Sequence, residues 1–464
     1  MKSRSQNMIS GPLFGSIVSY TIPIILTSLL QLLFHAADLV VVGRFCGSIS
    51  VAAVGSTGAI TNLIVNLFVG LSVGGGVCMA HAIGSRDREA MHRTVHTLLP
   101  TALVSGLVLT VVGVSCSRTF LTWMDTPEDV LPLSAQYMRI YFWGISFSMI
   151  YNFCSAVLRA AGDTRGPLVY LTVAGVTNVI LNLIFVTVLH MDVAGVALAT
   201  IISQGISAIL VVLALMRTEE GWKLELKKMR FYRQPLLKLI ALGLPAGIQG
   251  SMFSISNVII QSSINSFGPV FMSGNAAAGN IEGFVYASMN AFHQTALNFT
   301  GQNAGAGQYK RISRLYGICL ACVTAVGITM GSTVYGFAPK LLQIYITDSQ
   351  EAIAYAVERM AYICLPYFFL GMMDVTTGVL RGLGSSLTPT LISVIGVCGF
   401  RILWIATVFQ LPQFHTPQCL YLSYLTSWII TLLGQIIAYR IAFRKKEEEY
   451  RRLLARPEIR VPAE

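Results

Sequence analysis

Long apolar runs separated by short polar stretches recur along the whole chain. Reading the runs between polar breaks predicts twelve helical spans, at about 14–42, 51–80, 94–117, 132–158, 167–190, 194–216, 237–266, 273–303, 312–338, 353–380, 388–410 and 419–443. A helix needs about 20 apolar residues to cross a hydrocarbon core ~30 Å thick. Lipid offers no hydrogen bonds to an open backbone, so each run must form its own bonds as a helix.

The two halves of this pattern repeat each other. Positions 158–167 match 380–389, and Pro23 matches Pro245, both at an offset of 222 along the chain. Gly84 matches Gly305 at an offset of 221. Each half holds an even number of spans and therefore keeps one orientation. We expect an all-α membrane protein of twelve transmembrane helices, in two six-helix lobes related by pseudo-two-fold symmetry along the membrane normal. The expected segments are an N-terminal lobe (1–216), a cytoplasmic linker (217–236), a C-terminal lobe (237–443) and a cytoplasmic tail (444–464).

Composition and charge agree with a membrane protein. The chain is 54% hydrophobic and 11% charged, whereas soluble chains carry roughly 25% charged residues. Its net charge of +11 comes from basic residues between the spans, which favours a lipid partner over a nucleic acid. With the N-terminus inside, 26 of the 32 Lys and Arg residues fall on the inner side. Because short cytoplasmic loops are enriched in Lys and Arg, we expect a multi-pass plasma-membrane protein with both termini cytoplasmic.

Several motifs fit one known family. The first span carries Pro23 and then Asp38-Leu-Val-Val-Val-Gly43-Arg44, the fifth reads Asn178-Val-Ile-Leu-Asn182, and the sixth begins at Val193 with Ala-Gly195-Val-Ala-Leu-Ala-Thr200. Together with the Leu-Arg-x-x-Gly turns after spans four and ten, these motifs resemble the multidrug and toxic compound extrusion family, abbreviated MATE, and most closely its DinF-like bacterial branch. The resemblance covers about residues 10–443. It implies export of small organic, often cationic, compounds in exchange for Na⁺ or H⁺.

Asp38 is the first candidate for cation coupling. Asn178 and Asn182 are four residues apart and share a helix face, and Thr200 adds a hydroxyl. Carboxylate, amide and hydroxyl oxygens are hard ligands for a small cation, and in the family the matching positions form the cation site of the N-terminal lobe. Na⁺ as the coupling ion is then the one metal expected, with no other cofactor. Alternatively, Asp38 faces water or pairs with Arg44.

The sequence departs from the family pattern at two places. Asn182 stands where the DinF-like branch commonly has an aspartate, and the seventh span from Gln249 to Asn257 lacks the glutamate of NorM-type members. One carboxylate with two amides and a hydroxyl favours sodium over protons in the N-terminal lobe, because amide carbonyls remain ligands at every physiological pH.

The C-terminal lobe holds a second group of charges. Charges inside a bilayer cost from about 2.5 kcal/mol upward at the centre, so each needs a partner or a function. Glu282 in the eighth span and Arg401 in the eleventh lie at compatible depths, and we expect them to form an ion pair, whether functional or structural. Asp374 in the tenth span completes this charge network, as a coupling carboxylate, a cavity-wall group or a partner of Arg381.

A polar stripe marks the seventh span. Gln249, Asn257 and Gln261 are eight and four residues apart and therefore share one helix face. We expect this face to line the substrate cavity, with packing against neighbouring helices as the alternative.

These observations predict a cation-coupled antiporter that exports small organic molecules by alternating access, acting as a monomer and not as an enzyme. The nearest rival is a lipid-linked oligosaccharide flippase of the same superfamily, which would line its cavity with basic residues. A membrane prenyl transferase would need an aspartate-rich Mg²⁺ motif, and an intramembrane metalloprotease would need HExxH. Neither motif occurs in the sequence.

Overall fold

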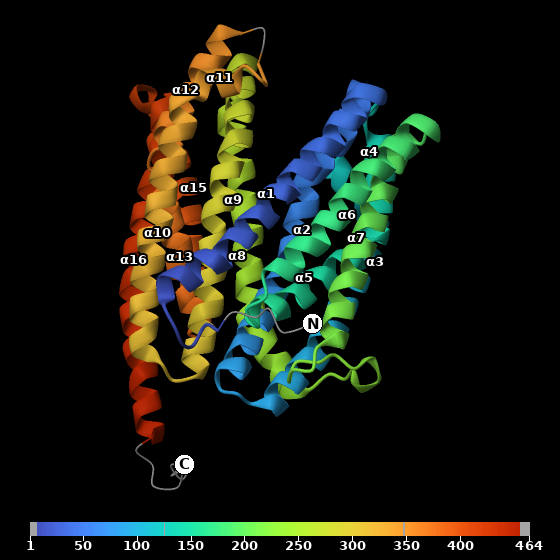
Figure 1. The fold of residues 1–464 in the computed structure, drawn as a ribbon. Coiled ribbons are helices and arrows are strands. Elements are labelled where there is room, and N and C mark those ends of the chain that lie inside the picture. Colours follow the sequence, from blue (N-terminus) through green and yellow to red (C-terminus); the bar gives the residue numbers. More distant parts are fainter. Residues whose placement is uncertain (1–6, 125, 347–348, 455–464) are drawn as a thin grey trace. The chain divides into compact units, whose positions relative to one another are not determined.

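The structure, a computed structural model, describes residues 7–124, 126–346 and 349–454, and its regular elements there are all helices (Figure 1). Residues 455–464 of the predicted tail lie outside the described residues. The chain forms two compact units. Unit 1 contains Val18–Met79 and Arg88–Val258, and unit 2 contains Asn7–Ile17, Ala80–Asp87 and the described residues from Ile259 onward.

The helical elements follow one another, most of them through short connections within the described residues. In the first half they are α1 (Leu13–Phe45), α2 (Ser48–Gly84), α3 (Arg88–Trp123), α4 (Leu131–Trp143), α5 (Ile145–Ala160), α6 (Arg165–Leu183), the π-helical η1 (Ile184–Val188), α7 (Asp192–Arg217), η2 (Leu226–Lys228) and α8 (Arg233–Asn265). In the second half they are α9 (Pro269–Gly305), α10 (Tyr309–Gly336), α11 (Ala338–Leu342), α12 (Gln350–Ile363), α13 (Phe368–Gly382), α14 (Leu387–Ser393), the π-helical η3 (Val394–Gly399), α15 (Phe400–Ala406), η4 (Val408–Gln410), η5 (Pro412–Phe414) and α16 (Pro417–Leu454). Helices α1, α2 and α8 each contribute residues to both units, and the predicted division at the linker 217–236 stays a prediction.

Each of the twelve predicted spans coincides with a described helix or with a broken one. Within the described ranges, nine helices are long and apolar enough to cross a membrane. Two further pairs, α4 with α5 and α12 with α13, pass the same test when each pair is taken as one span. The remaining predicted span, 273–303, is α9.

Helix α9 is long but too polar to be recognised as a membrane span by composition. It has 37 residues, and most of its side chains are buried, including Asn275, Glu282 and His293. It packs against α10, α12 and α13 of unit 2. Polar side chains are tolerated in such a helix because neighbouring helices, and not lipid, surround it.

The fourth and tenth predicted spans are bent and not straight. The α4–α5 pair bends by 47° and the α12–α13 pair by 46°. The breaks fall at Gly144 and at 364–367, which includes Pro366. Gly144 and Pro366 are separated by the offset of the repeat, 222. Glycine and proline are the usual causes of sharp helix kinks, so the two halves bend at equivalent points by different residue types.

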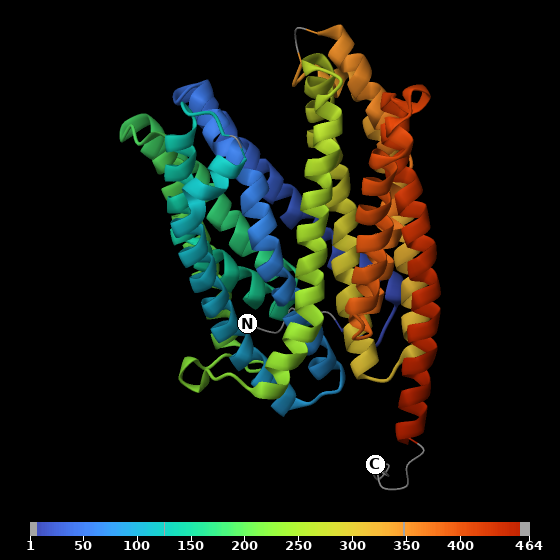
Figure 2. The ribbon, with the colours of Figure 1, turned by 180° about the vertical axis from the view of Figure 1, so that it is seen from behind.

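In unit 1, helices α2 and α8 come into backbone contact through glycines on their facing surfaces. A Cβ atom on Gly70 would lie 2.1 Å from the backbone nitrogen of Gly247, and one on Gly74 would lie 2.5 Å from that of Gly243. Both helices therefore carry a Gly-x-x-x-Gly face, the pattern that brings membrane helices into backbone contact. Figure 2 allows α8, in yellow-green, to be followed along its length.

The ends of α2 and α9 meet in unit 2 through matched positions. A Cβ on Gly84 would lie 2.0 Å from the carbonyl oxygen of Gln302, and one on Gly305 would lie 2.3 Å from that of His81. His81 precedes Gln302 by the same offset as Gly84 precedes Gly305. The two helices therefore contact each other through the same positions of the repeat.

Candidate functional site

Three helices bring the predicted cation-site residues together in unit 1. Asp38 comes from α1, Asn178 and Asn182 from α6, and Thr200 from α7. The Asn182 amide nitrogen donates to Asp38 Oδ1 and, over 3.3 Å, to Asn178 Oδ1. The Asn178 amide nitrogen in turn donates to Thr200 Oγ1 over 3.5 Å. The predicted grouping in space is confirmed, while its role in coupling stays a prediction. We call these four residues the N-lobe cluster.

Three of the four residues of the N-lobe cluster are buried, Thr200 is half-buried, and the cluster contains no positive side chain. Asp38 is 8% exposed, Asn178 5% and Asn182 0%. Among the described residues, no Lys, Arg or His forms an ion pair with Asp38, so the alternative pairing with Arg44 is not observed. In the same part of the chain, Asn182 Oδ1 is buried without a hydrogen-bond partner.

The oxygens of the N-lobe cluster fit a small hard cation. Asp38 supplies a full negative charge, Asn178 and Asn182 supply amide oxygens, and Thr200 supplies a hydroxyl. The unpartnered Asn182 Oδ1 is an acceptor that a cation would satisfy, and buried acceptors are costly when they are left unpaired. An apolar cluster that includes Val41, Tyr137 and Val196 is formed in part by residues of the same helices.

Glu282 has a different partner from the predicted one. Arg359 Nε donates to Glu282 Oε1 over 2.8 Å, and Arg359 Nη2 donates to Oε2 over 2.8 Å. This is a bidentate, fork-to-fork pair, the strong geometry for Arg and a carboxylate. Arg359 Nη1 also donates to Asn275 Oδ1 over 3.0 Å, and the Tyr421 hydroxyl donates to the same oxygen over 3.0 Å. We call Glu282, Arg359, Asn275 and Tyr421 the C-lobe ion-pair cluster.

The predicted Glu282–Arg401 pair is therefore wrong. Arg401 Nε donates to Ser427 Oγ over 2.9 Å, and its guanidinium lies 4.2 Å from the centre of the Tyr424 ring. Depth alone could not choose between Arg359 and Arg401, because both lie within predicted spans of the same lobe. Arg359 lies inside the predicted span 353–380. That position could have suggested it as an alternative ion-pair partner of Glu282.

Asp374 lies in a second buried group of unit 2, apart from the ion-pair cluster. Its carboxylate accepts a hydrogen bond from Asn290 and interacts electrostatically with the positive charge of Arg381. Its backbone oxygen bonds to His293 Nδ1 at 2.8 Å. Over the described residues, Asp374 Oδ2 is buried without a hydrogen-bond partner. Its function as a coupling or cavity carboxylate stays a prediction.

The three polar residues of the predicted cavity stripe do not share one environment. Gln249 is buried, whereas Asn257 and Gln261 are exposed. Gln261 donates to Asn265 Oδ1 over 2.9 Å on the same helix. Gln249 follows the Gly243–Gly247 face, where α8 packs tightly on α2 in unit 1. One helix face therefore passes from a packed region to an exposed one, a change that residue spacing does not reveal.

Comparison with known proteins shows the family. The MatE family model matches residues 23–184 and again residues 245–407. The two matches begin at Pro23 and Pro245, the pair that marks the repeat, and together they cover more than half of the chain.

Two bacterial relatives and one solved structure are similar over most of the chain. "Probable multidrug resistance protein YoeA" of Bacillus subtilis is 26% identical, over 92% of this chain and 94% of its own length. "Probable multidrug resistance protein YpnP" of the same organism is 27% identical, over 84% of this chain and 87% of its own. A solved multidrug resistance MATE transporter of the MOP superfamily, in an outward-facing conformation, matches with a TM-score of 0.87 at 18% identity, covering 97% of this chain and all of its own. The predicted all-α, two-lobe membrane fold is confirmed by these likenesses.

Proposed function

Because the chain belongs to the MatE family of multidrug and toxic compound extrusion transporters, we propose that it exports small organic molecules in exchange for a cation, by alternating access. That it is a MATE multidrug efflux transporter and a multi-pass membrane protein follows from the family match, the relatives and the apolar helices. The cation coupling, the exchange mechanism and the orientation with both termini in the cytoplasm are our proposals.

The observation that carries the coupling proposal is the chemistry around Asp38. Its carboxylate is buried beside amides, and no cationic side chain pairs with it within the described chain. A buried charge without a counter-ion is costly, by about 2.5 kcal/mol or more near the bilayer centre. A bound Na⁺ or H⁺ would remove that cost, so the state of the N-lobe cluster depends on whether a cation is present. Such differential binding is what allows an ion to shift a conformational equilibrium.

The C-lobe ion-pair cluster supports placing the ion site in the N-terminal lobe. Arg359 is equivalent to Tyr137 at the repeat offset of 222, and Tyr137 lies within the electrostatic reach of Asp38. The C-terminal lobe therefore has a permanent positive charge, the guanidinium of Arg359, at the position equivalent to Tyr137. With Glu282 already neutralised by Arg359, we assign coupling to Asp38.

The exposed part of α8 fits a water-facing substrate path. Asn257 and Gln261 are exposed amides on a membrane helix, and polar side chains within membrane spans usually face the protein interior or a water-filled cavity and not lipid. We therefore propose that they face the aqueous route that substrates follow, with Gln249 at its packed end.

The flippase alternative is less well supported. The described part of unit 2 buries three arginines, Arg359, Arg381 and Arg401, more than the sequence alone suggested. Arg359 is held by Glu282, Arg401 by Ser427 and Tyr424, and Arg381 interacts with Asp374. These cations are compensated internally and do not form an open basic surface for a pyrophosphate.

Substrate uptake into everted membrane vesicles, which corresponds to export from the cell, tests the proposal. The sodium and proton gradients are imposed separately. We expect Asp38→Asn to abolish gradient-driven transport while expression and membrane insertion stay normal. Asp129→Asn is the matched control, because Asp129 is an exposed loop carboxylate of the same unit. Full gradient-driven transport by Asp38→Asn would remove Asp38 from the mechanism. Transport that responds to neither gradient in the unchanged protein would refute cation exchange altogether.

A further inference from the structure

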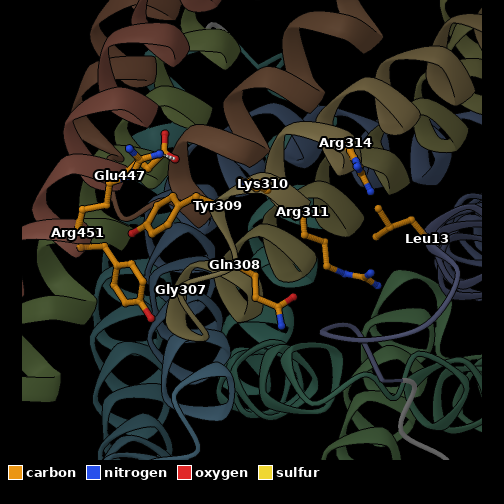
Figure 3. Close-up of a pocket in the computed structure, with 10 residues that line it drawn as sticks. Leu13, Gly307, Gln308, Tyr309, Lys310, Arg311, Arg314, Glu447 and Arg451 are labelled. Atoms are coloured by element: carbon orange, nitrogen blue, oxygen red, sulfur yellow. Dashed lines mark hydrogen bonds and ion pairs between the residues drawn. The ribbon is translucent and has the colours of Figure 1, made fainter. Parts of the chain in front are cut away.

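A pocket of about 630 Å³ lies in unit 2, away from the buried charge clusters. It is formed by the loop before α10, the first turns of α10, the last turns of α16 and Leu13 at the start of α1 (Figure 3). Its volume falls within the range of small-molecule sites, roughly 300–1,000 Å³. We call it the α10–α16 pocket.

The charge of this pocket is strongly positive. Lys310, Arg311, Arg314 and Arg451 line it, together with a single carboxylate, Glu447. Arg451 Nη2 donates to Glu447 Oε1 over 2.8 Å, so that carboxylate is already paired. Over the described ranges, none of the three cations on α10 forms an ion pair. In Figure 3, Arg311 and Arg314 lie on the side of Leu13, opposite Glu447 and Arg451.

Arg311 is held in place but has an unused donor. Its Nη2 donates to the carbonyl oxygen of Gly11 over 3.0 Å, which fixes the guanidinium at the start of α1. Its Nε is buried and, in the described part of the protein, has no hydrogen-bond partner. A guanidinium presents its donors as a rigid fork that fits phosphate oxygens. The pocket therefore offers an anion a guanidinium that the backbone holds in place, and not only flexible surface charges.

Aromatic rings of α16 and α10 form another wall of the pocket. The Tyr450 ring covers Gly307, where a Cβ atom would lie 2.1 Å from Tyr450 Cζ. Gly307 also has a φ of +70°, a conformation that side-chain-bearing residues rarely adopt. The rings of Tyr309 and Tyr450 are 5.6 Å apart, and those of Tyr309 and Phe443 are 6.0 Å apart. These contacts join the end of α16 to the start of α10 and give the pocket a preformed shape.

The equivalent loop of the first half has a different charge pattern. Arg86 is the repeat equivalent of Gly307, and it is followed by Asp87 and Glu89 among the basic residues. Glu89 pairs with Arg93 on α3. The loop 307–311 has no acidic residue, so the excess of positive charge is specific to the second half.

We propose that the α10–α16 pocket binds a phosphate group, presented by an anionic phospholipid at the bilayer surface or by free phosphate. Helix α10 is an apolar span that begins at Tyr309, so the pocket lies where that span leaves the membrane. Basic pockets at this level, between membrane helices, suit anionic headgroups. Tyrosine side chains favour the same interface, with the ring in the apolar region and the hydroxyl in the polar one. The geometry favours the lipid, whose acyl chains would follow the apolar surface of α10.

The test uses the purified full-length chain in detergent and three probes: a short-chain phosphatidylglycerol, the matching short-chain phosphatidylcholine, and inorganic phosphate. Apparent affinities come from ligand-induced shifts of the melting temperature. We expect phosphatidylglycerol to stabilise the protein and phosphatidylcholine to have no effect. Arg311→Gln with Arg314→Gln should weaken phosphatidylglycerol binding by about 30-fold, since two cations that line the pocket are removed. Lys227→Gln with Arg230→Gln, which removes two exposed linker cations, is the matched control and should bind as the unchanged protein does.

The outcomes separate the sources of the phosphate. A strong response to phosphatidylglycerol with a weak response to inorganic phosphate identifies the lipid, and equal responses identify free phosphate. If the double variant fails to fold, Lys310→Gln gives a second test, because Lys310 is exposed; its affinity should fall about fivefold. Equal affinities of the pocket variants and the control variant would overturn the proposal, as would equal responses to phosphatidylglycerol and phosphatidylcholine.

Discussion

At the scale of single residues, the two lobes surround their buried carboxylates in opposite ways. Asp38 accepts from an amide, which leaves its charge uncompensated, whereas both carboxylate oxygens of Glu282 accept from the guanidinium of Arg359. Removing one partner of a buried ion pair leaves an uncompensated charge, which typically costs about 3–5 kcal/mol, whereas replacing both partners is often nearly neutral. From this asymmetry we predict that the Glu282–Arg359 pair stabilises the fold, while the proposed coupling role belongs to Asp38.

We therefore predict that Arg359→Met lowers the free energy of unfolding by about 3–5 kcal/mol. The double variant Glu282→Gln with Arg359→Met should recover most of that loss. Thermal unfolding of the purified protein measures both changes. Arg452→Gln serves as control, because it removes a cation whose only ion pair among the described residues is the exposed one with Glu448, and exposed pairs contribute roughly 0–1 kcal/mol. An Arg359→Met variant as stable as the control would contradict the role of this pair in holding the lobe together.

A second prediction at this scale concerns the choice of ion. Asn182→Asp places a second carboxylate next to Asp38, and two adjacent carboxylates do not both remain ionised easily, so one of them binds a proton. We expect export by this variant to depend more steeply on pH, and less on sodium, than export by the unchanged protein. Vesicle transport across a series of pH values measures the change. An unchanged pH profile, together with wild-type transport that is indifferent to sodium, would show that the N-lobe cluster does not select the ion.

Residue-scale prediction from the sequence was accurate where helix spacing decided the contact. Asn178 and Asn182 share a face of α6 by their spacing, and the structure places them together with Asp38 and Thr200. It was inaccurate where two residues on different helices competed for one partner. Arg359 and Arg401 both lie within spans of the second half, and only the packing of α12 against α9 decides which of them reaches Glu282.

At the scale of helices, spacing predicted the spans but not their bends or their close contacts. Nothing in the apolar runs distinguishes the broken α12–α13 pair from a straight helix, although Gly144 and Pro366 were visible in the sequence. The glycine faces of α2 and α8 were visible too, but a Gly-x-x-x-Gly pattern does not name its partner. The packing of α2 on α8 through these glycines supplies that information.

This packing gives a prediction about α2. Gly74→Leu places a side chain against the backbone of α8, where even a Cβ would lie 2.5 Å from the nitrogen of Gly243. We expect a loss of at least about 1–3 kcal/mol of stability, the typical cost of overpacking a close contact. Gly58→Leu is the matched control on the same helix, since no neighbouring atom lies within 4 Å of its Cβ position. Melting temperatures of the two variants should differ clearly, and equal values would mean that α2 and α8 are not held in backbone contact.

At the scale of the whole molecule, the distribution of basic residues predicts the orientation in the membrane. With 26 of the 32 Lys and Arg residues on one side, we expect the C-terminal end of α16 to lie in the cytoplasm. A pair of reporters fused after residue 443, one active only in the cytoplasm and the other only outside, measures this directly. Activity of the external reporter alone would reverse the proposed orientation, and with it the assignment of the inner loops.

The repeat was the most informative whole-molecule signal in the sequence, and the structure extends it to the backbone. Gly162 and Gly384, in the two matching turns, have φ values of +91° and +84°, and Gly47 and Gly268 have values of +91° and +97°. The family model also begins its two matches at the same offset. The repeat shows that the halves differ at Tyr137 and Arg359, but it could not predict the partner of Arg359, because an offset carries no information about contacts made in one half alone.

The meeting of α2 with α9 has a consequence for the origin of the protein. His81 and Gly84 contact Gln302 and Gly305 reciprocally, and the two sets are the same positions of the repeat. A contact of this kind is what a two-fold homodimer makes, since each subunit offers the same patch to the other. An ancestral chain of half this length, with six spans, would therefore have already possessed this interface with its own copy. Gene fusion would have preserved it, and afterwards the two copies were free to diverge, as at Tyr137 and Arg359.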